Sequence, residues 1–235
     1  NPYNKKHTPG GSSSGSAAAV SSGMIPIALG SQTAASVIRP ASYCGVYGFK
    51  PSYGILPLDG VKPLAPSLDH AGFLARSLED IKIFFTAILG HEHFSQRPLK
   101  LRGKTASELA VTTLSGAWEM VLQRDCQQAV ADCFAGAKSR GSKFSEEVIF
   151  SDFERLTRDQ TTLMAAESVQ IFEYERKHEF QKLSDHIKNL LEEGSKVTST
   201  QLAQARIPIE NPKEFEDRLF CNADILLCPS TLDTA

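Results

Sequence analysis

Two serines in the first 40 residues follow pairs of small residues, a setting in which a hydroxyl group can do chemistry. Ser12 comes after Gly10-Gly11, and Ser36 comes after Ala34-Ala35. Small residues let neighbouring backbone N–H groups crowd around one point, which is the geometry that stabilises negative charge on a carbonyl oxygen. A serine hydroxyl is a weak nucleophile alone and needs an adjacent base or relay. The pattern therefore predicts a nucleophilic serine with a second serine as its relay.

The Gly/Ser run at residues 10–16, GGSSSGS, has three other interpretations. Runs of this composition are typical of flexible linkers, but a linker joins two units and few residues precede this one. A phosphate-binding loop has a strand before its first glycine and a lysine after its last, and the sequence offers neither. An ordered structural turn without chemistry remains as an alternative.

Apolar periodicity, capping residues and turn residues predict helices and strands that alternate along the chain. Helices are expected at residues 16–23, 78–90, 125–138, 159–183 and 184–194, and another begins at Asn211-Pro212. Strands are expected at residues 24–30, 71–75, 108–114, 144–150 and 224–229, with ordered loop at residues 51–68. This alternation predicts an α/β fold with a mixed, largely parallel central sheet covered by helices.

Composition and charge narrow the function classes. The net charge is −2 and no apolar run approaches the length of a membrane span, so neither nucleic acid nor a membrane is an expected partner. The five cysteines form no CxxC pair, which predicts reduced, packed thiols such as Cys44 in a cytoplasmic protein. The run His91-Glu92-His93 offers too few ligands on a polar connector, so no metal and no cofactor are expected.

The two serine loops also lie within longer motifs. The segments TPGGSSSGSAAAV, IALGSQTAASVIRPASYCGVYGFKPSYG and PLAPSLDHAGFLARS closely resemble the amidase signature family over residues 8–90. The resemblance implies the family's fold and its Ser–cis-Ser–Lys triad for amide hydrolysis. It makes Ser36 the nucleophile and Ser12 the relay on a cis peptide bond. It also implies an oxyanion hole formed by the backbone N–H groups of Thr33, Ala34, Ala35 and Ser36.

The resemblance further implies a substrate site and a base. The expected substrate-binding residues are Arg39, Gln32, Gly11 and Ser13. The base of the family is a lysine well upstream of the Gly/Ser loop. The lysines at positions 5, 6, 50 and 62 do not match that position, so the chain resembles a fragment without this residue.

Two departures from the family pattern bear on activity. Ala34-Ala35 stands where Gly-Gly is usual, which costs about 1 kcal/mol or more if either position needs a positive φ. Arg39 comes three residues after Ser36 instead of two, as in relatives that act on small acidic amides. On a helix beginning at Ser36, Arg39 would share the face of the nucleophile and could hold a substrate carboxylate. An ion pair with Asp69 is the equally open alternative.

These observations predict an amide hydrolase that acts on a small-molecule amide through a serine acyl-enzyme and releases ammonia or an amine. One alternative is the glutaminase-type A subunit of a tRNA-dependent amidotransferase, and another is a catalytically inactive fragment or degenerate relative. Residues 1–90 are expected to form the amidase signature core with both serine loops. Residues 91–235 are expected to be the C-terminal part of the same α/β domain, truncated at its end. A homodimer is left open.

Overall fold

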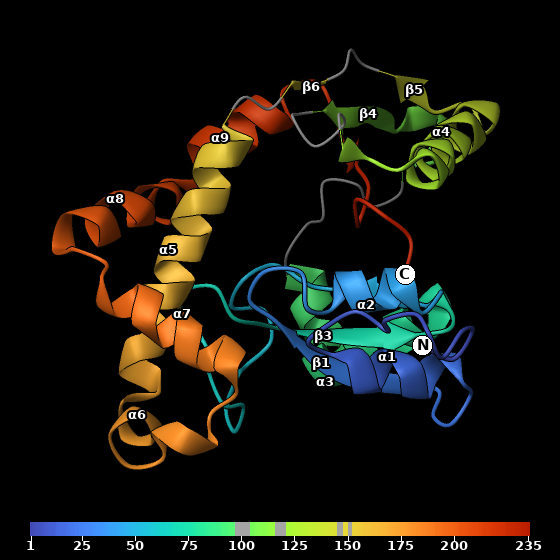
Figure 1. Ribbon diagram of the computed structural model, residues 1–235. Helices are drawn as coiled ribbons and strands as arrows, with labels where there is room; N and C mark the ends of the chain where they lie inside the picture. Colours follow the sequence, from blue (N-terminus) through green and yellow to red (C-terminus); the bar gives the residue numbers. More distant parts are fainter. Residues whose placement is uncertain (97–103, 116–120, 145–147, 150–151) are drawn as a thin grey trace.

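The computed structural model describes residues 1–96, 104–115, 121–144, 148–149 and 152–235, and it shows an α/β chain with two separate sheets (Figure 1). The first sheet contains β1 (Ile27–Gln32), β2 (Tyr47–Phe49) and β3 (His70–Ala75), in the order β1-β3-β2. Both pairings are antiparallel, with Gln32 opposite His70. The end of β1 therefore lies beside the start of β3.

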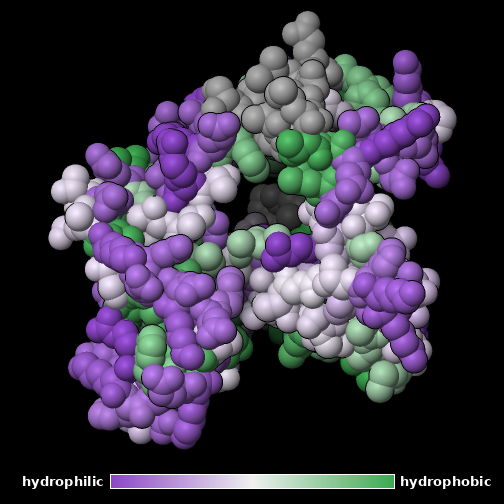
Figure 2. Space-filling model, viewed as in Figure 1, coloured by the Kyte–Doolittle hydropathy of each residue, from purple (hydrophilic) through white to green (hydrophobic). Residues whose placement is uncertain are grey.

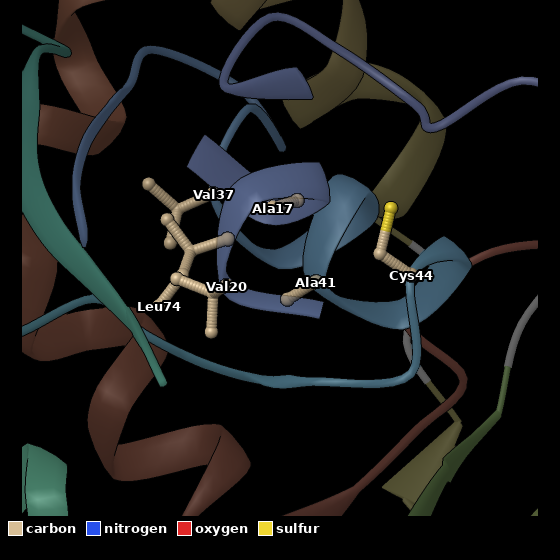
Figure 3. Packing of buried hydrophobic residues seen from close by; sticks show 6 residues of the cluster. All are labelled: Ala17, Val20, Val37, Ala41, Cys44 and Leu74. Atoms are coloured by element: carbon tan, nitrogen blue, oxygen red, sulfur yellow. The ribbon is translucent and has the colours of Figure 1, made fainter. Parts of the chain in front are cut away.

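Helices cover both faces of the first sheet. Leu74 on β3 packs in a buried cluster with residues of α1 (Ser14–Ser21) and α2 (Ile38–Tyr43) (Figure 3). Phe73 points to the opposite face, because side chains alternate along a strand, and its ring contacts Phe84 and Phe85 on α3 (Leu78–Gln96). The other members of the cluster, each at most 2% exposed, are Ala17, Val20, Val37, Ala41 and Cys44.

The second sheet is parallel. Its central strand β4 (Ala110–Ser115) pairs with β5 (Lys143–Phe144), β6 (Val148–Ile149) and β7 (Ile225–Leu227). The chain passes from β4 to β5 through α4 (Arg124–Ser139), the type of crossover that parallel strands require (Figure 1). The predicted α/β class is confirmed. The antiparallel pairs lie in the first sheet and the parallel pairs in the second, so neither sheet combines the two kinds of pairing.

Residues 153–219 are mostly helical and form the arm on the left of Figure 1. α5 (Phe153–Ile171) packs against α7 (Asp185–Ser195) and α8 (Ser199–Glu210). The remaining elements are α6 (Glu173–His178), α9 (Pro212–Leu219) and 3₁₀ helices at Ala106–Glu108 and Phe180–Lys182. Hydrophilic side chains dominate the visible surface of this arm (Figure 2). None of the described helices has both the length and the apolar character needed to cross a bilayer.

Several predicted helix starts are confirmed by their caps. The Ser184 hydroxyl accepts a hydrogen bond from the Ile187 N–H at the start of α7, and α9 begins with Pro212. At the start of α3, the Asp80 N–H donates to the Ser77 hydroxyl at 3.0 Å. This helix continues past Gly90 to Gln96, because one glycine weakens a helix without stopping it. The run at residues 91–93 therefore lies on α3, and its assignment to a connector is wrong.

Other helix predictions need correction. The single helix predicted over residues 159–183 is two helices, α5 and α6, separated at Phe172. Lys62 Nζ lies 4.9 Å from the centre of the Phe172 ring, a tertiary contact that periodicity does not reveal. α8 has no counterpart among the predicted helices, although Thr198 and Gln201 form a capping box. The strand predicted at residues 144–150 corresponds to β5 and β6, and its residues 145–147 and 150 lie outside the described residues.

Candidate active site

The Gly/Ser loop and the loop after β1 are in direct contact. The backbone N–H of Ser13 donates to the carbonyl oxygen of Ser36 at 3.1 Å. The peptide bond between Gly11 and Ser12 is cis, as the resemblance implies. The structure therefore brings together the two bends that carry Ser12 and Ser36. The linker interpretation of residues 10–16 is wrong, because this run is an ordered part of the fold.

Gly10 determines how closely the Gly/Ser loop approaches α2. Its φ is +77°, and a Cβ atom added at this position would lie 2.9 Å from the Cα of Pro40. The positive φ disfavours L residues, and the contact leaves no room for a side chain. Only glycine fits here. The bend before Ser12 is therefore built against the helix that follows Ser36.

Two other serines of the Gly/Ser run attach this segment to β1. The hydroxyl of Ser16 donates to the carbonyl of Leu29 at 2.7 Å, and the hydroxyl of Ser13 donates to the carbonyl of Ser31 at 3.3 Å. These bonds hold the start of α1 along an edge strand. Ser13 thus has a structural contact, and its substrate contact stays a prediction.

Gln32 fixes the far end of the loop that carries Ser36. Its side chain is 7% exposed, and its Oε1 accepts hydrogen bonds from the N–H groups of Val37 at 2.9 Å and Ile38 at 3.1 Å. These N–H groups stand at the start of α2, where no helical carbonyl is available to them. Gln32 therefore positions the loop from within, a role that its place in the sequence did not indicate. Its contact with substrate stays a prediction.

Asp69 fixes the near end of the same loop. The hydroxyl of Thr33, the first residue after β1, donates to Asp69 Oδ1 at 2.5 Å. Asp69 Oδ2 accepts from the N–H groups of Leu64 at 2.8 Å and Ala65 at 3.0 Å. The carboxylate is 7% exposed. An acidic residue inside the apolar, turn-rich segment PLAPSLDHAG was the sequence signal for this role.

The backbone donors next to Ser36 are available to a ligand. Within the described residues, no acceptor is hydrogen-bonded to the N–H of Ala34, Ala35 or Ser36. Neither alanine has a positive φ, so Ala-Ala carries no backbone penalty in this loop. Adjacent N–H groups of this kind form a concavity suited to an anionic oxygen.

Arg39 contacts the Gly/Ser loop. Its Nε and Nη2 both donate to the carbonyl oxygen of Gly11, at 3.3 and 3.2 Å. This carbonyl belongs to the cis peptide bond that precedes Ser12. The alternative in which Arg39 pairs with Asp69 is wrong, because no ion pair joins these two described residues and the guanidinium bonds the Gly11 carbonyl instead.

Burial is the main cause of a shifted pKa at three residues around the first sheet. Burial lowers the pKa of Lys50, whose Nζ donates to the carbonyl of Pro51 at 2.9 Å. Burial, together with the charge of Lys50, lowers the pKa of His70, whose Nδ1 donates to the carbonyl of Leu68 at 2.6 Å. Burial raises the pKa of Cys44, and its buried position confirms it as a packed thiol. No hydrogen bond joins these groups to Ser12 or Ser36 in the part of the chain that is described. The prediction of packed thiols is wrong for three other cysteines, which are exposed: Cys133, Cys221 and Cys228.

Residues near both ends of the sequence contact α2. The hydroxyl of Tyr43 donates to Asp233 Oδ1 at 2.6 Å, and this bond raises the pKa of Tyr43. The side-chain amide of Asn1 donates to the carbonyl of Tyr43 at 2.7 Å. The helix that follows Ser36 is therefore held from the first sheet, from residue 1 and from the segment after β7.

A cavity of about 400 Å³ lies on the face of the first sheet that α3 covers. Its lining includes Leu29 and Ser31 of β1, Phe73 of β3, and Ile88 of α3. Ser12, Ser36 and Arg39 are not in its lining. The two candidate catalytic serines therefore lie outside this cavity.

The α/β scaffold and its two contacting serine loops, one of them with a cis Gly–Ser bond, define this chain as amidase-like in fold. Residues 1–235 match the family model named Amidase, and the chain belongs to that family. The division into residues 1–90 and 91–235 stays a prediction.

Curated relatives match part of the chain. The A subunit of the glutamyl-tRNA(Gln) amidotransferase of Mycoplasma pneumoniae is 50% identical over 91 residues, which is 39% of this chain and 19% of the relative. The corresponding A subunit from Exiguobacterium sibiricum is 52% identical over 91 residues, with the same coverage. The aligned segment thus spans about a fifth of these relatives.

Solved structures match the whole chain. A crystal structure of an amidase superposes with a TM-score of 0.85 at 27% identity. A structure from work on the evolutionary origins of an s-triazine catabolic enzyme superposes with a TM-score of 0.84, also at 27% identity. Each match covers 100% of this chain and 52% of the other. The chain therefore spans about half the length of these solved amidase folds.

Proposed function

We propose that this amidase-family protein hydrolyses amide bonds through an acyl-enzyme formed on Ser36. One observation carries the proposal: the cis Gly11–Ser12 bend is hydrogen-bonded to the Ser36 loop beside three backbone N–H groups that have no acceptor among the described residues. Donors arranged in this way stabilise the negative charge of a tetrahedral intermediate, and each is worth about 3 kcal/mol of barrier.

The reaction begins with attack of the Ser36 hydroxyl oxygen on the amide carbonyl carbon. As the C–O bond forms, the proton of Ser36 passes to the hydroxyl of Ser12, which passes its own proton to the lysine base that the family resemblance implies. The carbonyl oxygen becomes an oxyanion and is held by the N–H groups of residues 33–36. The C–N bond then breaks, the amine leaves with the relayed proton, and water hydrolyses the acyl-enzyme.

For the substrate, we infer a small amide that also carries a carboxylate. Arg39 is exposed and uses Nε and Nη2 on the Gly11 carbonyl. Its Nη1 takes part in no hydrogen bond to the described residues and is a donor that a carboxylate can use. The Gly11 contact holds the guanidinium over the bend that carries Ser12, next to the reacting atoms.

The substrate class is tested with Arg39→Leu and two amides of equal size, one acidic and one neutral. We expect KM for the acidic amide to rise about a hundred-fold, because a charge-assisted contact is lost, and KM for the neutral amide to change little. Loss of the Gly11 contact lowers kcat for both substrates alike. Equal changes in the two KM values would overturn the acidic substrate.

A second candidate function is the glutaminase-type A subunit of a tRNA-dependent amidotransferase. The 50–52% identity to proteins of that name, over 91 residues, favours it. Such a protein would release ammonia from glutamine for a partner. Turnover of glutamine in preference to other small amides, together with co-purification of partner subunits, would favour this candidate over a free-standing amidase.

The central test is covalent labelling of the protein by a fluorophosphonate, which forms a phosphonyl ester with an activated serine. We expect labelling at Ser36 and its loss in Ser36→Ala. Ser22→Ala is a matched control, because the Ser22 hydroxyl only bonds carbonyl groups of its own helix. Absence of labelling in a folded protein would overturn the proposal and would favour the inactive relative.

A further inference from the structure

The loop that carries Ser36 is clamped at both of its ends by buried side chains. At the far end, Oε1 of Gln32 accepts the N–H groups of Val37 and Ile38. At the near end, Oδ1 of Asp69 accepts the hydroxyl of Thr33. Between these two clamps, the N–H groups of residues 34–36 bond no acceptor in the described structure. The direction of these donors therefore depends on the clamps and not on bonds of their own.

The Asp69 clamp is continuous with the first sheet. Asp69 directly precedes β3 and Thr33 directly follows β1, and Gln32 and His70 pair across the two strands. The two side chains thus meet where the antiparallel ladder ends. Hydrogen bonds to a carboxylate that is 7% exposed are stronger than neutral ones, because water competes little for its oxygens. The first residue of the loop therefore has a stiff attachment.

The turn that carries Asp69 is itself anchored outside the first sheet. The N–H and the hydroxyl of Ser67 donate to the two carboxylate oxygens of Glu167 on α5, at 3.0 and 2.7 Å. Glu167 is 9% exposed. The hydroxyl of Ser168, the next residue of α5, donates to the carbonyl of Leu64 at 3.3 Å. Residues 64–69 are thus fixed to α5, and Asp69 transmits that fixed position to the Ser36 loop.

We propose that Asp69 is a positioning residue for the reaction: through the Thr33 hydroxyl it holds the backbone donors of residues 34–36 in the orientation that stabilises the oxyanion. The inference rests on the proposed function and assigns to Asp69 a role in turnover. Oriented donors matter most in the transition state, where the charge on the oxygen is greatest. Loss of the clamp therefore lowers kcat and leaves KM nearly unchanged.

The test compares Asp69→Asn, Thr33→Val and the double variant with the unmodified protein. We expect each single variant to lower kcat, and the rate of fluorophosphonate labelling at Ser36, about ten- to a hundred-fold. The double variant should label no more slowly than the slower of the two single variants, since both changes break the same contact. Thr33→Val keeps the Leu64 and Ala65 bonds of Asp69, so it reports on the clamp even if Asp69→Asn fails to fold.

Asp80→Asn is the matched control, because Asp80 is hydrogen-bonded to Ser77 at the start of α3 and not to the Ser36 loop. Its labelling rate should equal that of the unmodified protein. A second readout is the NMR order parameter of the Ala34 and Ala35 amides, which should fall in Thr33→Val and stay unchanged in Asp80→Asn.

The outcomes separate this inference from the proposed function. Failure of the unmodified protein to label at Ser36 would overturn the proposed function and the role of Asp69 with it. Labelling of the unmodified protein and of Thr33→Val at equal rates would overturn the role of Asp69 alone. An equal rise in KM for every variant, with kcat unchanged, would also overturn it, since that result indicates lost substrate binding.

Discussion

The unit around the first sheet and the unit around the second sheet are built in different ways. In the first, Leu74 and Phe73 are fully buried on opposite faces of β3, and helices cover both faces. In the second, α4 has no buried residue, and among the residues of that unit whose burial is described, Val111 and Thr112 of β4 are the buried ones. The candidate active site lies on the better-packed unit.

The hydrogen bonds of the two units also differ in how deeply they are buried. Around the Ser36 loop, buried side chains of Gln32 and Asp69 bond backbone N–H groups. In the second unit, Asp224 also accepts a backbone N–H, that of Ala110 at 2.9 Å, but its side chain is partly exposed and pairs with the exposed Lys104 at 2.8 Å. An ion pair open to solvent contributes at most about 1 kcal/mol. Of the two units, the first therefore has the more deeply buried side-chain hydrogen bonds, and they lie at the loop whose backbone donors must keep their direction.

Two glycines with positive φ test the comparison most strongly. Gly10 has a φ of +77° and lies against Pro40, whereas Gly141 has a φ of +82° and an added Cβ would make only ordinary contact with Ser107, at 3.4 Å. We expect Gly10→Ala to lower the free energy of unfolding by about 3 kcal/mol, from both the φ and the overlap, and Gly141→Ala by about 1 kcal/mol. Urea denaturation measures both. Equal losses of unfolding free energy in the two variants would show that the close contact between Gly10 and Pro40 adds nothing to the cost of the substitution.

A second pair of variants compares the packing of the two units. Leu74→Ala removes a fully buried side chain and leaves a cavity, so we expect a loss of about 2–4 kcal/mol in the free energy of unfolding. Val130→Ala, on a helix without buried residues, should change it by about 0.5 kcal/mol or less. Thermal unfolding followed by circular dichroism measures the difference. A large effect of Val130→Ala would contradict the contrast between the units.

The smallest expected effect is on how the free energy of unfolding depends on pH, and it concerns a residue of the first sheet. The pKa of His70 is lowered in the folded state, so protonation favours the unfolded chain. Stability is therefore retained above the ordinary histidine pKa of about 6.5 and is lost as pH falls below it. His70→Gln should reduce the loss of unfolding free energy between about pH 7 and pH 5. An unchanged slope in His70→Gln would contradict this assignment.

Much of the fold could be predicted from local signals. The start of α7 at Ser184 and of α9 at Pro212 follow from capping rules, and α3 follows from apolar spacing. The break at Phe172 could not be predicted, because Phe172 contacts Lys62 from a distant segment. Local patterns report on neighbours in sequence, and they do not report on such contacts.

In the candidate site, too, some features could be predicted from local sequence and others depend on contacts between distant segments. Their small-residue loops singled out Ser12 and Ser36 as candidates, and the family resemblance implied the cis bond that the structure shows. The partner of Arg39 was not predictable, since a guanidinium can bond a carboxylate or a carbonyl equally well, and the structure shows the Gly11 carbonyl. The bond between Thr33 and Asp69 joins residues 36 positions apart and becomes visible only when β1 and β3 are paired.

The bond between Tyr43 and Asp233 can form only late in the synthesis of the chain. These residues are 190 positions apart, so a ribosome delivers Asp233 long after it has delivered the whole of α2. A nascent chain can form the serine bends and the sheet beneath them while Tyr43 still lacks this acceptor. This contact of α2, the helix that follows Ser36, therefore waits until residue 233 has been translated.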